Sequence, residues 1–332
     1  MPLAGVASQV PVSDGAPLNY FIHAAGPAAG PTLRLDWIFT AICVAVCVIV
    51  GGLLSAAILR RRPDAPLQQL AHGANGLRWI VIGVGVSVPV LIAMLVYALF
   101  TLDQVASPAE TPALTITVTA YDWWWKVDYD DAPDASARFV TANEIHIPTG
   151  EPVRFKLKSA DVIHTFWVPR LAGKTQAIPG QTNEQWLQAD APGVYRGQCS
   201  QFCGAQHAHM AFEVIAESRA DFAAWSAQQA QQARATDLQA DAAVSAGKTL
   251  FLDKCAGCHA IRGTEAQGAQ APDLTHLNSR RLIAAGTLSN TVQNQLAWIT
   301  EAQRIKPDSL MPSIALKRDE AASLSAYIAT LK

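Results

Sequence analysis

Two long stretches without a charged side chain constrain this chain more than any other feature of its sequence. Residues 37–59 and 79–102 contain no Asp, Glu, Lys or Arg. Each is a little over 20 residues long, which is enough for an α-helix to cross a hydrocarbon core about 30 Å thick. Trp37 and Trp79 stand at their ends, where interfacial aromatic residues are expected. The sequence therefore predicts a two-helix transmembrane hairpin over residues 34–104.

The connector between these stretches predicts how the hairpin is oriented. It contains four arginines, at positions 60, 61, 62 and 78, and one acidic residue, Asp64. An excess of positive charge marks the cytoplasmic side of a membrane. We therefore expect a two-pass protein of a bacterial inner membrane with both termini on the periplasmic side. Residues 1–33 are rich in Ala, Gly and Pro and lack the basic and apolar regions of a signal peptide. They predict a loose extramembrane arm, and either a signal was removed or the first helix inserts the chain.

Composition narrows the functional class of the rest of the chain. Only 16% of the 332 residues are charged and the net charge is -2, so nothing indicates the clustered basic surface that nucleic-acid binding needs. Six cysteines fall into three close pairs, a pattern that favours ligand or cofactor-attachment sites over a disulfide framework. Cys43 and Cys47 lie one helical turn apart in the first apolar stretch. Free cysteine usually packs as a small hydrophobic residue, so we interpret this pair as packing and not as a metal site.

A short loop rich in sulfur and nitrogen ligands follows in the second half of the chain. Cys199, Cys203, His207 and Met210 lie within twelve residues, a soft ligand set that suits copper or zinc and not calcium or magnesium. Structural zinc sites more often space cysteines by two, and a mononuclear blue-copper site needs only one cysteine. With His164 upstream, two thiolates can bridge two coppers while each histidine terminates one. The alternative is a periplasmic disulfide with surface histidines.

This loop, the segment Val-Ile-His-Thr-Phe-Trp-Val-Pro around His164 and residues 174–180 resemble subunit II of haem–copper cytochrome c oxidases. The resemblance implies a cupredoxin fold for residues 105–218 and a binuclear copper (CuA) centre. Its implied ligands are His164, Cys199, the backbone carbonyl of Gln201, Cys203, His207 and Met210.

Two positions depart from the family pattern. The family has glutamate where this chain has Gln201, and that carboxylate also reaches a magnesium ion; a neutral amide is a poorer ligand for a hard cation. Near the start of the second helix, where the family commonly has a glutamate implicated in proton entry, the charged residue here is Arg78. Magnesium binding in this chain, and the role of the family glutamate in proton entry, therefore do not follow from the resemblance.

Period-two alternation in residues 113–120 and 153–157, between Pro- and Gly-rich turns, predicts an antiparallel β-sandwich or barrel. His164 is expected near a strand end, and residues 193–199 are expected to form the strand that enters the ligand loop. The resemblance assigns electron entry from cytochrome c to Trp123; the alternative role is an aromatic belt or core packing. His146 and His209 are expected at the surface and not as ligands, although His209 could instead approach subunit I.

Residues 223–246 are rich in Ala and Gln, favour helix and have almost no apolar face, which predicts a solvated helical spacer; we place the linker between the two domains at residues 219–240. The motif Cys255-Ala-Gly-Cys258-His259 is typical of covalent haem c attachment, with His259 on the iron. A thioredoxin-like redox pair would need a βαβ context, which the sequence does not indicate.

Residues 241–332 resemble a small all-α class I cytochrome c. Of four methionines, only Met311 lies in this segment, so we predict a His/Met iron site. His276 is the rival for the sixth ligand. The resemblance also implies that the carbonyl of Pro272 orients His259. The spacing of Leu324, Ile328 and Leu331 predicts an amphipathic terminal helix.

Together these features predict a multi-domain electron-entry subunit of a proton-translocating terminal oxidase, enzymatic only in complex. Electrons would pass from a soluble or membrane cytochrome or cupredoxin to the haem, then to copper, then to haem in subunit I, where oxygen is reduced to water. Subunits I and III are the expected partners. The alternatives are the small subunit of a copper-containing nitric oxide reductase and an anchored electron-transfer protein that serves no oxidase. A quinol oxidase is disfavoured, because those relatives lose copper ligands that are all present here.

Overall fold

A computed structural model describes residues 22–60, 75–131, 135–233 and 241–332. The chain forms two compact units: one comprises Gly30–Ser107, and the other comprises Met1–Ala29 together with Pro108–Lys332. Parts of three expectations lie outside the described residues. These are the first 21 residues of the arm, the connector charges at positions 61, 62 and 64, and the end of the spacer at 234–240.

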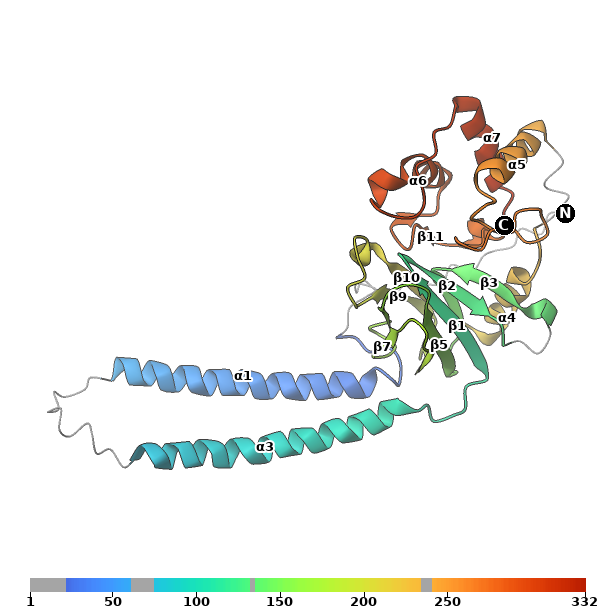
Figure 1. Cartoon of the computed structure of the whole chain (residues 1–332). Helices are drawn as coiled ribbons and strands as arrows, with labels where there is room; N and C mark the ends of the chain where they lie inside the picture. Colours follow the sequence, from blue (N-terminus) through green and yellow to red (C-terminus); the bar gives the residue numbers. More distant parts are fainter. Residues whose placement is uncertain (1–21, 61–74, 132–134, 234–240) are drawn as a thin grey trace. The chain divides into compact units, whose positions relative to one another are not determined.

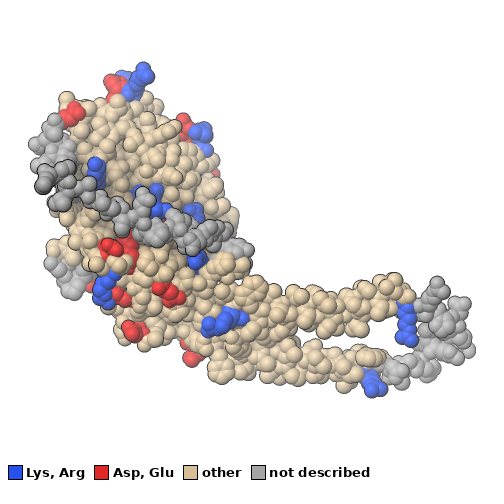
Figure 2. Space-filling view, turned by 180° about the vertical axis from the view of Figure 1, so that it is seen from behind, with Lys and Arg blue, Asp and Glu red and all other residues tan. Residues whose placement is uncertain are grey.

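The smaller unit consists of α1 (Gly30–Leu59) and α3 (Asn75–Ala106), which run side by side in opposite directions (Figure 1). The segments Gly30–Leu59 and Gly76–Ala106 are long and apolar enough to span a membrane. Their large apolar side chains are exposed along both helices, and Figure 2 shows Lys and Arg side chains only toward the helix ends. A surface this apolar is unfavourable in water, so the unit serves as a membrane anchor.

The larger unit contains a β-sandwich of two five-stranded sheets, ordered β3-β2-β1-β5-β8 and β4-β10-β9-β6-β7. Aromatic side chains fill the space between them: Trp125 is fully buried and makes edge-on contacts with Phe166 and Phe212. The strands are β1 (Leu114–Tyr121), β2 (Trp124–Tyr129), β3 (Phe139–Ala142), β4 (Glu144–Pro148), β5 (Val153–Ser159), β6 (His164–Trp167), β7 (Lys174–Ala177), β8 (Asn183–Leu187), β9 (Gly193–Cys199) and β10 (Ala211–Glu217).

The alternation read from the sequence corresponds to the buried face of the first sheet. Ile116 and Val118 on β1 and Phe155 on β5 are fully buried. The expectation of purely antiparallel pairing is wrong, because β1 pairs with β5 in parallel and β4 pairs with β10 in parallel. Alternation reports which face of a strand is buried and carries no information about the direction of its neighbour.

The end of the N-terminal arm lies against the β-sandwich. The amide of Ala25 donates to the carbonyl of Arg170 at 2.7 Å, and its carbonyl accepts from the amide of Asp190 at 2.9 Å. Only glycine fits at position 26, since a Cβ there would lie 2.1 Å from the carbonyl oxygen of Gln188. The expectation of a loose arm is therefore wrong for residues 22–29.

The helix that follows the sandwich, α4 (Arg219–Gln229), also differs from expectation. Trp225 stacks on the ring of His146 at 3.9 Å between centroids, and Phe222 packs against the same core. His146 is only 5% exposed, so its predicted surface position is wrong. One tryptophan is enough to dock a short helix that has no apolar stripe, because an aromatic ring buries a large area.

The C-terminal part is helical, with α5 (Ala242–Lys254), α6 (Val292–Ile305) and α7 (Arg318–Ile328). It also contains a small antiparallel hairpin whose strands, β11 (Leu282–Ile283) and β12 (Leu288–Ser289), have two residues each. Helices α5 and α7 pack closely at Gly247, where a Cβ would lie 2.0 Å from the carbonyl oxygen of Ser323. Phe251, Leu324 and Tyr327 are buried between them. The predicted amphipathic terminal helix corresponds to α7.

Candidate metal centre and haem site

The ligand loop is closed at its base by strand pairing. Strands β9 and β10 pair antiparallel, and the amide of Cys199 donates to the carbonyl of Met210 at 3.0 Å. Strand β6 lies on the other side of β9, with Phe166 opposite Cys199. His164, the first residue of β6, is therefore brought beside the loop although it lies 35 residues upstream. One sheet fixes both ends of the loop and His164 as well, so the ligand geometry does not depend on the loop alone.

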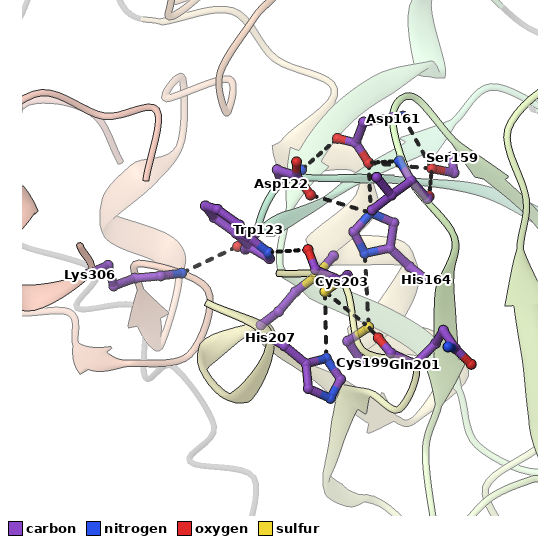
Figure 3. Close-up of polar contacts among 12 residues, drawn as sticks. Asp122, Trp123, Ser159, Asp161, His164, Cys199, Gln201, Cys203, His207 and Lys306 are labelled. Carbon is purple, nitrogen blue, oxygen red and sulfur yellow. Dashed lines mark hydrogen bonds and ion pairs between the residues drawn. The ribbon is translucent and has the colours of Figure 1, made fainter. Parts of the chain in front are cut away.

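The six predicted copper ligands converge in this structure (Figure 3). The Sγ atoms of Cys199 and Cys203 are 3.7 Å apart, and both cysteines are free, so the disulfide alternative is not formed. Around them lie one imidazole nitrogen per thiol, one thioether and one carbonyl: His164 Nδ1 at 3.9 Å and Gln201 O at 3.2 Å from Cys199 Sγ, and His207 Nδ1 at 3.5 Å and Met210 Sδ at 3.9 Å from Cys203 Sγ.

The electrostatics of this cluster call for a cation. A hydrogen bond from the Cys203 thiol lowers the pKa of Cys199, whereas the neighbouring Cys199 raises the pKa of Cys203 well above its usual range. Two buried thiols this close do not both ionise unless positive charge compensates them. The donors are soft and lie within a few ångströms of one another, which fits copper.

The second ring nitrogen of His164 is held by a carboxylate that the sequence analysis missed. His164 Nε2 lies 2.7 Å from Asp161 Oδ1 and 3.9 Å from Asp122 Oδ1, which orients Nδ1 toward Cys199. Burial raises the pKa of Asp122, and the nearby Asp161 raises it further. Carboxylates in this position fix the orientation and raise the basicity of a ligating imidazole. The Asp-x-x-His spacing in the sequence could have indicated this contact. Asp161 lies before strand β6, however, and only the turn between β5 and β6 places its carboxylate beside His164.

Trp123 lies against the copper loop. Its Nε1 donates to the carbonyl of Cys203 at 2.8 Å, and a Cβ at Gly204 would lie 2.8 Å from its ring. Gly204 also has a φ of 113°, which glycine adopts without strain. Trp123 is half-buried here, whereas the core position belongs to Trp125. His209 is exposed and its Nδ1 lies 2.9 Å from Gln206 Oε1, as expected for a histidine that is not a ligand.

The haem-binding motif follows α5 directly and borders a cavity of about 390 Å³. Cys255, Cys258, His259 and Met311 all line it, as does Trp123 from the copper domain. The His259 Nδ1 lies 2.8 Å from the carbonyl of Pro272, the contact expected from the resemblance. Burial lowers the pKa of His259, so its imidazole stays neutral and Nε2 is available as a ligand. A deep, mostly apolar cavity with these four side chains fits a covalent haem.

His276, the rival iron ligand, is turned away from this role. Its Nδ1 lies 2.7 Å from the carbonyl of Lys332 and its Nε2 lies 3.0 Å from the carbonyl of Gln231. Both ring nitrogens thus face backbone carbonyls. His276 is therefore a structural histidine, which connects the C-terminal residue Lys332 to Gln231 in the linker.

Arg280 is a second residue that sequence reasoning missed. It lines the cavity, is only 8% exposed, and donates through Nη2 to the carbonyl of Asp273. Its Nε has no partner among the described residues, so an anionic substituent of a haem would complete it. Its neighbour Arg281 instead contacts Glu144 and Glu213 of the copper domain. The sequence shows two adjacent arginines, but only the fold shows that Arg280 lines the cavity while Arg281 contacts Glu144 and Glu213.

Lys306 lies where the copper loop and the haem cavity meet. Its Nζ contacts the carbonyls of Trp123, His209 and Ala284, and it also lines the cavity. Burial lowers its pKa to about 8, which leaves the ammonium charged at neutral pH. Nothing in the sequence distinguished this lysine from the others.

Known proteins match both parts of the larger unit. A family model for the cytochrome c oxidase subunit II periplasmic domain matches residues 132–217, and one for cytochrome c matches residues 244–332. Cytochrome c oxidase subunit 2 of Alkalihalophilus pseudofirmus is 33% identical over 87% of this chain and 83% of that protein. The Bacillus subtilis protein of the same name is 28% identical over 96% and 93%.

Among solved structures, the periplasmic domain of subunit II of cytochrome oxidase from Bradyrhizobium japonicum matches with 31% identity and a TM-score of 0.34, covering 37% of this chain and 96% of that one. The family models imply copper in the β-sandwich and haem in the helical domain. The sequence match to the Alkalihalophilus protein spans most of both chains. The chain therefore belongs to the cytochrome c oxidase subunit II family, as a membrane-anchored subunit with a C-terminal cytochrome c domain.

Proposed function

We propose that this chain is the electron-entry subunit of a terminal cytochrome c oxidase. In this proposal electrons reach a haem attached through Cys255 and Cys258, pass to a binuclear copper centre, and leave for haem in subunit I, where oxygen is reduced to water. The observation that carries it is the position of Trp123, which lines the haem cavity and also donates to the carbonyl of the copper-loop residue Cys203. One side chain thus touches both sites.

The copper-site residues would hold two coppers bridged by two thiolates, a centre that takes up and releases one electron. The chain's own contribution is a fixed geometry. Both ends of the loop are hydrogen-bonded into the sandwich, and Asp161 holds the ring of His164. Ligands held this firmly move little between redox states, and little movement favours fast electron transfer.

In the haem domain, His259 and Met311 would hold the haem iron, a ligand pair that raises the haem potential. Pro272 fixes the ring of His259 through its carbonyl. Arg280 would meet the anionic edge of the haem, because its Nε is buried and has no partner among the described residues. The haem supplies reversible one-electron chemistry when bound, and these residues orient and shield it.

The external donor would deliver electrons at the haem domain and not at Trp123. Trp123 is half-buried between the copper loop and the haem cavity, whereas Cys258 beside the haem site is exposed. The resemblance-derived role of Trp123 therefore becomes an internal one in this fused subunit. Its donor would be a soluble or membrane cytochrome or cupredoxin.

The partner side of the copper loop would face subunit I, with subunit III in the same complex. Phe202, next to Cys203, is 76% exposed, and Val162 and Ile163 before His164 are exposed as well. Large apolar side chains grouped beside a metal site favour a protein interface. The side chain of Gln201 is exposed too, but an amide is a weak magnesium ligand. We therefore propose that Gln201 binds copper through its backbone carbonyl and that its side chain binds no metal.

The anchor would place these domains outside a bacterial inner membrane. Arg60 at the end of α1 and Arg78 in the first turn of α3 lie at the connector end of the hairpin, and positive charge favours the cytoplasmic side. We propose the division made from the sequence, with the anchor at 34–104, the copper domain at 105–218 and the haem domain at 241–332. Both family matches fall inside the last two.

Low-temperature electron paramagnetic resonance with metal analysis on the detergent-purified chain tests this function. We expect one unpaired electron shared by two coppers, beside one haem iron per chain. Zinc or a single localised copper would contradict the copper assignment. Co-purification with a large polytopic partner, and turnover with oxygen and not with nitric oxide, distinguish an oxidase from the nitric oxide reductase and free-standing alternatives.

A further inference from the structure

Lys306 is a buried cation with no acidic partner in the described part of the chain. It caps the C-terminal end of α6, where its amide donates to the carbonyl of Ala302, and it is only 3% exposed. No carboxylate of the described residues lies within ion-pair distance of its Nζ. Burying an ammonium is costly unless hydrogen bonds compensate it, so its position calls for an explanation.

Three backbone carbonyls supply that compensation, and they come from both domains. Lys306 Nζ lies 3.3 Å from Trp123 O and 3.0 Å from His209 O in the copper domain, and 3.3 Å from Ala284 O in the haem domain. Figure 3 shows the side chain reaching across to Trp123. An ammonium group has three donors, so the three acceptors match it.

Neighbouring contacts follow the same seam. The carbonyl of Pro307 accepts from Gln206 Nε2 at 2.7 Å, and the amide of Ala211 donates to the carbonyl of Ala285 at 3.1 Å. Ala284 and Ala285 have φ values of 52° and 54°. Left-handed backbone is unfavourable for alanine and persists only where the surroundings hold it. The haem domain thus keeps a strained segment in order to present its carbonyls to Lys306 and Ala211.

We propose that Lys306 is a positioning residue for electron transfer between the haem and copper sites. Its ammonium holds the haem domain on the backbone of Trp123 and His209 and places a positive charge beside the copper loop. Trp123 is then fixed from two sides, by Lys306 at its carbonyl and by Cys203 at its indole nitrogen. This inference rests on the proposed function.

The charge of Lys306 has a consequence that packing alone does not have. The transfer oxidises the haem iron by one electron and reduces the copper pair by one electron, and it forms and breaks no bond. The added electron makes the copper site one unit more negative. A fixed positive charge nearby favours that state, so removing the charge makes the copper harder to reduce.

The test compares Lys306→Met with Arg304→Met in the full chain loaded with both cofactors. Arg304 lies on the same helix end but is exposed and pairs with Glu301, so it is the matched control for charge. In Lys306→Met we expect amide hydrogen exchange to accelerate by about tenfold or more in segments 206–211 and 284–286, because three charge-assisted hydrogen bonds are lost. We also expect a lower copper reduction potential and slower haem-to-copper transfer, with an unchanged haem spectrum. Arg304→Met should match the wild type.

Wild-type exchange in Lys306→Met would overturn the inference, and so would faster exchange with a wild-type copper potential, since Lys306 would then only support the fold. If Lys306→Met does not fold, Lys306→Gln keeps a donor at the junction while removing the charge. A copper reduction potential equal to that of the wild type in Lys306→Gln would then overturn the inference. The two proposals fail differently. A wild-type protein without haem-to-copper transfer contradicts the proposed function, whereas a Lys306 variant equal to a wild type that transfers contradicts only this inference.

Discussion

The copper domain fills its own core, whereas the haem domain surrounds a cavity. In the sandwich, the rings of Trp125, Phe166 and Phe212 pack together directly behind the ligand loop. In the helical domain, Phe251 and Ile328 border an opening of about 390 Å³ next to the haem-binding motif. We therefore expect the first site to fold without a metal, and we expect the second to need a haem to complete its core. Copper would then be a guest in a finished fold, whereas haem would be part of the fold.

The strongest test of this contrast removes the haem. Cys255→Ala combined with Cys258→Ala should abolish covalent haem, seen by haem staining of a denaturing gel. The helical domain should lose cooperative thermal unfolding by circular dichroism, because a cavity of this size is left without its occupant. The copper resonance signal should persist. A helical domain that still unfolds cooperatively without haem would contradict the contrast.

The corresponding change in the copper loop should spare the fold. Cys199→Ser or Cys203→Ser is expected to abolish the shared-valence copper signal while leaving the haem spectrum intact. The unfolding free energy of the sandwich without copper should fall by only about 1–3 kcal/mol, because a hydroxyl replaces a buried sulfur at the edge of the core. Cys43→Ser, in the membrane anchor, is the matched control. A normal copper signal in either loop variant would refute the bridging assignment.

A smaller effect should follow from the carboxylate behind His164. Asp161→Asn keeps the size of the side chain but removes the charge that holds Nε2, so copper affinity should fall by about tenfold to a hundredfold. Competition with a copper chelator measures the affinity. Asp190→Asn, at an exposed carboxylate of the same domain, should bind copper as the wild type does. Equal affinities for the two variants would show that the scaffold alone orients the imidazole.

The last effect concerns a buried charge on β4, the edge strand of the sheet that also carries the ligand strands β6 and β9. Burial lowers the pKa of His146, but contacts with Glu144 and Glu217 outweigh it, so the pKa lies above its ordinary value of 6.5. The imidazolium therefore stabilises the fold fully below pH 6.5, and this contribution is lost as the pH rises through the folded-state pKa. His146→Leu should cost about 3 kcal/mol at pH 6, because Glu144 and Glu217 lose their cationic partner while they stay largely buried.

Chemical unfolding of the metal-free protein between pH 6 and 9 measures this effect. The wild type should lose stability toward higher pH, and His146→Leu should lose less over the same range. Equal slopes would contradict the assignment of the charge to His146. The experiment also sharpens the comparison, because it reports on the sandwich without involving either cofactor.

Sequence reasoning succeeded where chemistry requires residues close together in the chain. Cys199 and Met210 border one loop, and Cys255 and His259 belong to one turn, so ligand spacing together with the family resemblance predicted groups of side chains that do lie close together in the structure. It failed where a residue's environment is made by distant segments. His146 was expected at the surface because nothing local indicates that Trp225 returns to cover it. The prediction of a solvated spacer was wrong for the same reason, because nothing local indicates that Trp225 packs against His146.

By itself the sequence determined the anchor, the two kinds of site and the order in which they follow. Hydrophobic length, strand alternation and ligand spacing are local properties, and each is set by the geometry of a single element or loop. Only the tertiary structure decided how the sites are joined. The contacts of Trp123 with Cys203 and of Lys306 with Trp123 connect residues 80 and 183 positions apart. Such contacts arise from packing between segments that are distant in the chain, and no periodicity or spacing encodes them.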